Sequence, residues 1–206
     1  GLGYNWGGTA GAMEMTNICM RDNFGVEVDY NVEIDFESFI RVIDFMGGIE
    51  IELTEAEAKY LNNDDLYVKY DVQPGLQYLD GMAALSYARM RKAEGDADSD
   101  IKRSARQRLV IEKLFEKIRG LSVTELQSVA YTLLPEITTT MTPKDVAELM
   151  IKMLPHLRDL KFEKGSIPIK TTYWGVLQDP YGSVLLFYPD QNKRLIRAFT
   201  EGEVKP

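Results

Sequence analysis

The stretch GMAALSYARMRKAEGDADSDIKRSARQ, residues 81–107, carries the densest pattern in this 206-residue chain. In its first half, four side chains lie two residues apart: Leu85, Tyr87, Arg89 and Arg91. This spacing predicts a turn of helix that leads into a strand, on which the four side chains share one face. Paired guanidinium groups suit bidentate contacts to phosphate, so the two arginines indicate an anion site, with an exposed strand face as the alternative.

The second half of the stretch begins a helix that is predicted from about Ser99 to Arg119 and ends at Gly120. At 100° per residue, one face of this helix carries an apolar stripe made of Val110, Ile111, Leu114 and Ile118. Toward the helix start the same face continues into Gln107, Arg103 and Asp100. Because polar groups are costly to bury without partners, this face predicts a polar cleft that binds a ligand, with a satisfied Asp100–Arg103 pair in the core as the alternative.

Positive charge is concentrated in the same region. The whole chain has 24 Lys+Arg and 32 Asp+Glu, a formal net charge of −8. Residues 86–119 hold 10 basic and 6 acidic side chains, whereas residues 1–85 hold 4 basic and 16 acidic ones. The acidic total predicts no nucleic-acid partner, because affinity for a phosphate backbone scales with the cations presented. The basic cluster suits a discrete phosphate or pyrophosphate, and a solvated helix face with internal ion pairs is the alternative.

The remaining sequence alternates between helical and extended patterns. Helix start signals occur at Thr9, Asp35, Thr54, Ser122, Thr142 and Asp190. Period-two alternation predicts strands at 26–34 and 49–53, and residues 158–188 have the pattern of strands and turns. This order predicts an α/β fold with three α/β/α layers, in which helices flank a central mixed sheet.

Length and composition are those of a globular domain, with 45% hydrophobic and 27% charged residues. We expect residues 1–206 to form a single domain, with a motif-bearing core at 26–120 and a less characteristic part at 121–206. One cysteine and one histidine exclude an internal disulfide framework and a zinc site built from histidines. No apolar run approaches the roughly 18 residues that a membrane helix needs.

Two ordered runs resemble the signature of the LytR–CpsA–Psr family. The first run is FGVEVDYNVEIDFESFIRVIDFMGGIEIEL at residues 24–53, and the second is the stretch quoted above. The positions of the second run that match are Leu79-Asp80-Gly81, Ala84-Leu85, Tyr87, Arg89, Arg91, Ser99-Asp100, Arg103 and Arg106-Gln107. The resemblance covers residues 1–120 well and the rest of the chain weakly.

This resemblance implies an enzyme of the cell envelope, found mostly in Gram-positive bacteria. Family members are phosphotransferases that move an anionic glycopolymer, of the teichoic acid or capsular polysaccharide type, from a polyprenyl-pyrophosphate carrier to peptidoglycan. The reaction is magnesium-assisted, so Mg²⁺ is the implied cofactor. The resemblance places the pyrophosphate on Arg89, Arg91, Arg103, Arg106 and Gln107. It also implies catalytic roles for Arg89 and Arg103, and makes Asp100 an orienting or acid/base carboxylate.

The chain departs from the family pattern at its start. Family domains carry an upstream half with a G-x-D-x-R motif and an S-I-P-R-D segment, and this chain begins near the stretch that follows it, here Tyr4–Gly8. The magnesium ligands and the membrane anchor are expected in that upstream part. The implied location is therefore the extracytoplasmic face of the membrane, with a single-pass anchor in the full-length protein, and we expect poor activity from this portion alone.

Two other functions compete with glycopolymer transfer. A non-catalytic domain that binds polyprenyl phosphate or wall polymer would use the same arginines without chemistry. A transcription regulator is disfavoured by the net charge of −8 and by the lack of a helix-turn-helix signal. Replacing Arg89 or Arg103 by alanine separates the first two functions, because only an enzyme has a transfer activity to lose.

Overall fold

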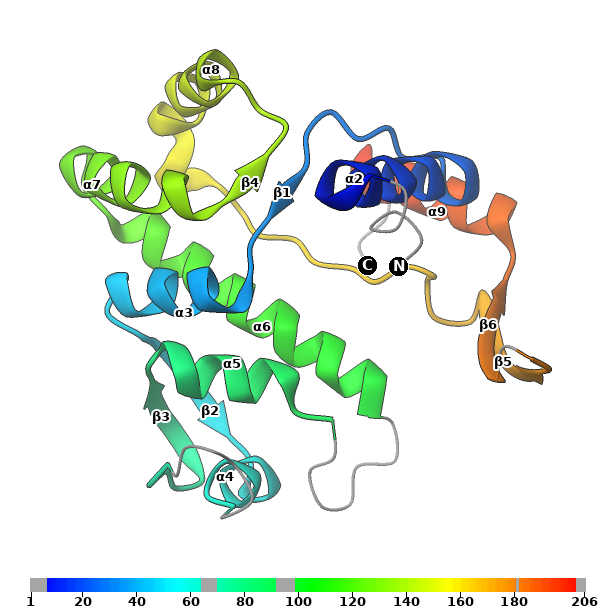
Figure 1. The fold of residues 1–206 in the computed structure, drawn as a ribbon, viewed down its shortest axis with the longest axis horizontal. Coiled ribbons are helices and arrows are strands. Elements are labelled where there is room, and N and C mark those ends of the chain that lie inside the picture. Colours follow the sequence, from blue (N-terminus) through cyan, green and yellow to red (C-terminus); the bar gives the residue numbers. More distant parts are fainter. Residues whose placement is uncertain (1–6, 64–69, 92–98, 181, 203–206) are drawn as a thin grey trace. The chain divides into compact units, whose positions relative to one another are not determined.

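The computed structural model describes residues 7–63, 70–91, 99–180 and 182–202 of the chain, which Figure 1 draws as a coloured ribbon. Tertiary contacts divide the chain into two compact units. Unit 1 combines residues 1–31 with 163–206, and unit 2 consists of residues 32–162. The stretch that dominates the sequence lies in unit 2.

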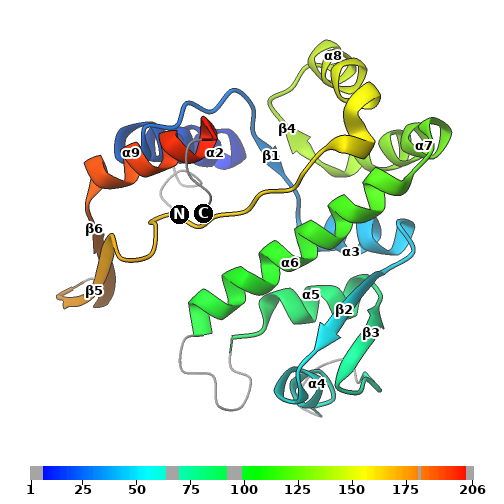
Figure 2. The ribbon, with the colours of Figure 1, turned by 180° about the vertical axis from the view of Figure 1, so that it is seen from behind.

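The core of unit 2 is built from six elements in chain order: α3 (Phe36–Phe45), β2 (Ile49–Leu53), α4 (Glu55–Leu61), β3 (Gly75–Leu79), α5 (Gly81–Arg89) and α6 (Ser99–Gly120). Strands β2 and β3 pair antiparallel, with Ile49 opposite Leu79. Along β2, three buried apolar side chains alternate with exposed Glu50 and Glu52. Helix α5 contacts both α3 and α6, and α6 also contacts β2. Seen from behind, α6 crosses the unit as one long diagonal helix (Figure 2).

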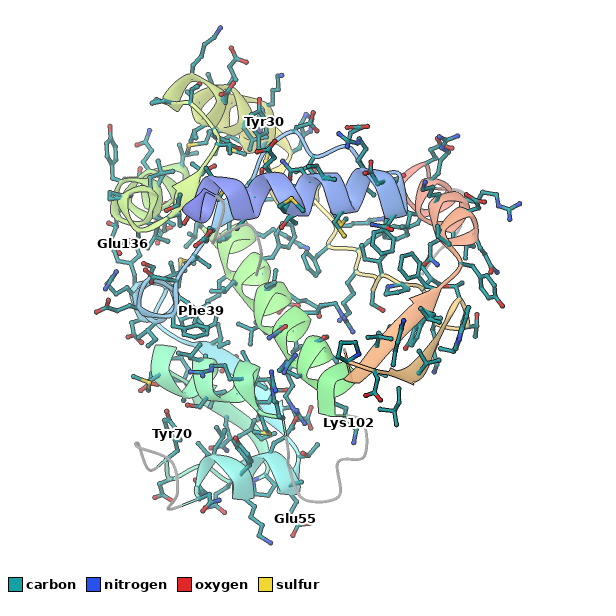
Figure 3. The ribbon with its side chains drawn as sticks, turned by 45° about the vertical axis from the view of Figure 1, so that its right-hand side comes forward. Tyr30, Phe39, Glu55, Tyr70, Lys102 and Glu136 are labelled. Atoms are coloured by element: carbon teal, nitrogen blue, oxygen red, sulfur yellow. The ribbon has the colours of Figure 1, made fainter. Side chains whose placement is uncertain are left out.

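A second group of elements completes unit 2. It contains β1 (Val32–Glu33), α7 (Val123–Leu133), η2 (Leu134–Glu136), β4 (Thr138–Thr139), α8 (Pro143–Met153) and η3 (Leu154–Asp159). Strand β1 pairs with β4, Val32 lying opposite Thr139. The strand predicted at 26–34 is therefore wrong for all but two residues, because the backbone groups outside this short ladder have no neighbouring strand among the described residues. In the same unit, Arg41 of α3 binds Glu136 of η2, the residue labelled in Figure 3.

Unit 1 contains α2 (Gly8–Cys19), the π-helix η1 (Met20–Phe24), β5 (Tyr173–Gln178), β6 (Gly182–Phe187) and α9 (Pro189–Thr200). Strands β5 and β6 form an antiparallel hairpin. Phe24 stacks on Phe187 with ring centroids 5.1 Å apart. The residue that precedes α9 is Tyr188 rather than the predicted cap Asp190, because Pro189 takes the first helical position and Asp190 falls in the first turn.

The helix start signals read from the sequence are largely confirmed. Asp35 accepts a hydrogen bond from the Ser38 backbone N at 2.7 Å. Capping boxes form at three predicted starts, between the pairs Thr54 and Glu57, Ser122 and Glu125, and Thr142 and Asp145. Each signal concerns residues three apart in the chain, so it needs no information about tertiary packing.

Helix α5 replaces the strand predicted for SYARMRK. Asp80 caps the helix by accepting a hydrogen bond from the Ala83 backbone N at 2.8 Å. Tyr87 and most other α5 side chains are buried, because α3 and α6 both contact this helix. A helix that is buried on several sides has no polar face that repeats every 3.6 residues. Its apolar residues can then fall two apart in the sequence, as they do in a strand. Arg89 is the last residue of α5 and Arg91 lies beyond it, so the two do not share a strand face.

The predicted α/β class is confirmed, and helices and strands both contribute to the core. The sequence predicted a central mixed sheet, whereas the strands in the described ranges form three antiparallel pairs, β1–β4, β2–β3 and β5–β6. A two-stranded pair is marginal by itself. The pair β2–β3 is stabilised by the helices that cover it, since β2 contacts α4 and α6 and β3 contacts α5.

The start of α5 packs unusually close to α3, and this contact gives a first prediction. A Cβ added at Gly81 would lie 2.3 Å from the carbonyl oxygen of Ile40 and 2.8 Å from its Cα. Backbone atoms cannot rotate away as a side chain does, so Gly81→Ala should lower the free energy of unfolding by about 3 kcal/mol, measured by urea titration. The matched control is Gly120→Ala, where an added Cβ meets nothing within 4 Å. Equal stability of the two variants would contradict this close packing.

Candidate active site at the junction of α5 and α6

The side chain of Arg106 on α6 is hydrogen-bonded to the segment that follows α5. Arg106 Nη1 donates a hydrogen bond to the carbonyl oxygen of Met90 at 3.1 Å. Met90 lies between Arg89 and Arg91 in the chain, so this bond holds that segment beside the first turns of α6. Arg103 precedes Arg106 by three residues on the same helix. The structure therefore brings the backbone between Arg89 and Arg91 to Arg106 of α6.

The side chain of Arg106 is buried and forms an ion pair inside the protein. Its Nε donates to Glu57 Oε1 at 2.7 Å, and the two side chains are only 7% and 10% exposed. Glu57 Oε2 accepts from the backbone N and the hydroxyl of Thr54, at 3.0 Å and 2.9 Å. Burial and the neighbouring Glu57 carboxylate raise the pKa of Tyr87 to about 12. Arg106 thus anchors α6 to α4 and α5, and its predicted contact with pyrophosphate stays a prediction.

The ion pair at Glu57 makes stability depend on pH. Burial acts to raise the pKa of Glu57, but hydrogen bonds from Arg106 and Thr54 outweigh burial and lower the pKa below its ordinary value of 4.5. The unfolded chain therefore binds a proton at Glu57 more readily than the folded protein does. The stabilisation that the charged Glu57 gives to the fold is complete above the ordinary pKa, and it is lost as the pH falls through the lowered pKa of the folded state.

Acid titration tests this linkage. We expect the free energy of unfolding to stay level between about pH 7 and pH 5 and to fall below about pH 4.5. The measurement is urea unfolding at each pH, followed by circular dichroism. A Glu57→Gln variant should show a shallower decline, because it removes one of the carboxylates with a lowered pKa. The same acid slope in variant and wild type would contradict the assignment.

Arg89 is positioned by an aromatic ring that the sequence did not indicate as functional. Its guanidinium carbon lies 4.5 Å from the centroid of the Phe36 ring, at the start of α3. Phe36 itself is 58% exposed. A guanidinium over an aromatic face is attracted to the ring and keeps its N–H edge free for an anion. Nothing local in the sequence indicates this contact.

The inward face of α6 agrees in part with the predicted one. Val110 of the predicted stripe is buried, and Leu114 of the same stripe packs against the core together with Leu109. Ile111, which was also placed in the stripe, is 53% exposed. The buried face is therefore rotated from Ile111 toward Leu109, because contacts with α5 and β2 orient this helix and cannot be read from its own sequence.

This rotation changes the surroundings of the predicted ligands. Gln107 is exposed and Arg103 is half-buried. Arg89 and Arg91 are exposed as well. Asp100 begins α6, and its side chain lies outside the described part of the chain. The orienting or acid/base role of Asp100 therefore remains a prediction.

A shallow hollow of about 210 Å³ opens beside the junction. Its lining residues are Glu57, Tyr87, Lys102, Ala105, Arg106 and Leu109. Lys102 is exposed on the first turns of α6, where Figure 3 labels it. The hollow is lined by one acidic and two basic side chains, and its acidic residue, Glu57, is ion-paired with Arg106.

The residues that the structure describes do not form a metal centre. Within the described ranges, no three side chains of His, Cys, Asp or Glu come together as a metal-binding group.

Comparison with known families gives a match over most of the chain. The family model LytR_cpsA_psr matches residues 3–183. The chain belongs to the LytR–CpsA–Psr family. The matched residues include both ordered runs that carry the sequence signature.

Relatives within the LytR–CpsA–Psr family include a named transferase. Polyisoprenyl-teichoic acid–peptidoglycan teichoic acid transferase TagT of Bacillus subtilis (strain 168) is 28% identical over 152 residues, 73% of this chain and 45% of TagT. The chain thus spans about half the length of such relatives.

Solved structures show the same fold. Protein gbs0355 from Streptococcus agalactiae matches with a TM-score of 0.76 and 22% identity, over 99% of this chain and 65% of that one. TagT bound to LIIa-WTA matches with a TM-score of 0.69 and 24% identity, over 98% of this chain and 69% of that one.

A search for membrane-spanning helices among the described residues finds none with the necessary length and apolar character.

Proposed function

We propose that this member of the LytR–CpsA–Psr family is a phosphotransferase. Its donor is an anionic glycopolymer, of the teichoic acid or capsular polysaccharide type, linked to polyprenyl pyrophosphate, and its acceptor is a hydroxyl of peptidoglycan. The family membership and the name of the relative TagT support a role in glycopolymer transfer. The proposed place of action is the extracytoplasmic face of the membrane, where the full-length protein is held by its anchor.

The observation that supports this proposal is the hydrogen bond that Arg106 of α6 donates to the carbonyl oxygen of Met90. Because Met90 lies between Arg89 and Arg91, this bond keeps that segment close to α6, the helix that also carries Arg103. Phosphoryl transfer needs little covalent help from a protein, and catalysis depends on positioning and on stabilising charge over the phosphate oxygens. Guanidinium groups that the fold holds in place can both position a phosphate and stabilise the charge on its oxygens.

The proposed reaction forms one P–O bond and breaks another. The acceptor hydroxyl oxygen attacks the phosphorus nearest the sugar, and the bond from that phosphorus to the bridging oxygen breaks. The leaving group is polyprenyl phosphate, and the product is a phosphodiester between glycopolymer and peptidoglycan. Asp100 is proposed to orient the acceptor and take its proton. Arg89, Arg91 and Arg103 bind the two phosphates, while Mg²⁺ belongs to the proposal only through the family resemblance.

Reconstituted transfer tests the proposal. The full-length protein in detergent is mixed with a polyprenyl-pyrophosphate-linked glycopolymer and isolated peptidoglycan, and polymer bound to the wall is measured after washing. The expected result is wall-bound polymer together with an equal amount of polyprenyl phosphate. If the donor binds but no polymer moves, the result supports a non-catalytic binding domain and contradicts the proposal.

A further inference from the structure

The far end of α6 borders another hollow in unit 2. This hollow measures about 620 Å³ and is lined by Glu116, Arg119, Gly120 and Arg158. Arg119 lies in the last turn of α6, and Arg158 lies in the 3-10 helix η3. Two arginines from separate elements therefore face one space, at the opposite end of the helix from the α5–α6 junction.

The two walls of this hollow are fixed against each other. Helix α6 contacts η3 directly. Leu157, the neighbour of Arg158, is buried. The ring centroids of Phe115 on α6 and Phe162 just beyond η3 lie 5.4 Å apart. These apolar contacts hold Arg119 and Arg158 in place without using their charges.

Neither arginine is neutralised within the described part of the chain. Arg119 Nε is buried and has no hydrogen-bond partner there. Arg158 is exposed. The carboxylate in the lining, Glu116, binds Lys113 at 2.9 Å. A cation near the end of a helix is favoured by the helix dipole, but the dipole does not explain why a second arginine, from η3, lines the same hollow. An anion bound between the two arginines explains it.

We propose that Arg119 and Arg158 bind a phosphodiester of the glycopolymer, at a second anion site. This inference rests on the proposed function, because it takes its ligand class from the polymer. With 22 residues, α6 is about 33 Å long at 1.5 Å per residue. An extended polymer chain would be bound at the α5–α6 junction by its pyrophosphate. The same chain would then reach the second site several repeat units away from that pyrophosphate. The site thereby favours long, phosphate-bearing polymers over short or uncharged ones.

Binding of a synthetic oligo(glycerol phosphate) tests this second site. Titration calorimetry uses the full-length protein and an Arg119→Gln/Arg158→Gln variant at two salt concentrations. The double variant should bind the oligomer at least ten-fold more weakly and with a smaller salt dependence, because two phosphate contacts are lost. The matched control is Lys144→Gln/Lys152→Gln on α8, which removes the same charge from exposed positions. Thermal unfolding of both variants checks that they fold.

Each outcome of this binding test either supports or overturns the second anion site. An oligomer affinity within two-fold of wild type, or an equal loss in the control, overturns the second site. Arginine-dependent binding to phosphatidylglycerol vesicles, without binding to the oligomer, also overturns it and assigns the arginines to the membrane. A selective loss of oligomer binding supports it. Failure of the wild type to transfer polymer, with this selective loss intact, rejects the proposed function and leaves the phosphodiester site standing.

Discussion

We expect Arg89→Ala and Arg103→Ala to lower the rate of glycopolymer transfer by the full-length protein about 10²–10³-fold each. Both side chains are proposed to bind the phosphates, on which charge would develop as polyprenyl phosphate leaves in the proposed reaction. Removing a donor that stabilises this charge affects the transition state more than the bound donor. The measurement is the initial rate of polymer transfer, together with the affinity for the lipid-linked donor.

Two further variants test whether the loss of transfer depends on the position of the arginine and on the shape of its guanidinium group. Arg21 is an exposed arginine of unit 1 that pairs with the adjacent Asp22, so Arg21→Ala should transfer at the wild-type rate. Arg89→Lys keeps the charge but loses the planar fork over Phe36, and we expect it to remain well below wild type. Wild-type rates in both alanine variants at the junction would contradict the catalytic role of these arginines.

We expect Arg106→Met to lower the free energy of unfolding by about 3–5 kcal/mol, the largest stability effect in unit 2. Methionine keeps most of the apolar stem but leaves the Glu57 carboxylate buried without its ion-pair partner. It also removes the hydrogen bond that holds Met90. The measurement is urea unfolding at neutral pH.

The control and the double variant separate the ion pair from general damage to α6. Arg108 is a half-buried arginine two residues further along the same helix, and Arg108→Met should change stability by less than about 1 kcal/mol. The double variant Glu57→Leu/Arg106→Met should recover part of the loss, because no buried charge then remains unpaired. A mild effect of Arg106→Met alone would mean that Arg106 is free to serve the ligand instead.

The features predicted well are those encoded by near neighbours in the chain. The three capping boxes and the Asp35 cap formed where the sequence placed them, since each depends on residues three apart. The length of α6 was also predictable, because Gly120 ends a long run of good helix formers. The alternating strand β2 follows from its own period of two.

The features missed depend on distant partners. Glu57 and Arg106 lie 49 positions apart, and nothing local in either segment indicates that they pair. The same is true of Phe36 beneath Arg89. The first turn of helix α5 was predicted correctly, but its second half was mistaken for a strand because neighbours on several sides bury the helix and hide its helical period. These tertiary contacts decide which arginine is structural and which ones remain available for a ligand.

The site residues named from the sequence remain a prediction, and the structure adds contacts that the sequence did not indicate. The sequence concentrated positive charge at 86–119 and the family signature named its arginines. The structure brings the segment 89–91 to the start of α6, and it gives Arg106 an interior partner. Gln107 faces outward, contrary to the predicted stripe, because packing against α5 and β2 sets the rotation of α6.

The most direct test of the central claim follows the phosphorus atoms. A donor is prepared with radioactive phosphorus only in the phosphate next to the sugar, and is incubated with the full-length protein and peptidoglycan. Phosphotransfer predicts that the label enters the wall with the polymer and that unlabelled polyprenyl phosphate is released. Label that stays with the lipid as polyprenyl pyrophosphate, while polymer enters the wall, would contradict phosphotransfer and assign the enzyme to glycosyl transfer.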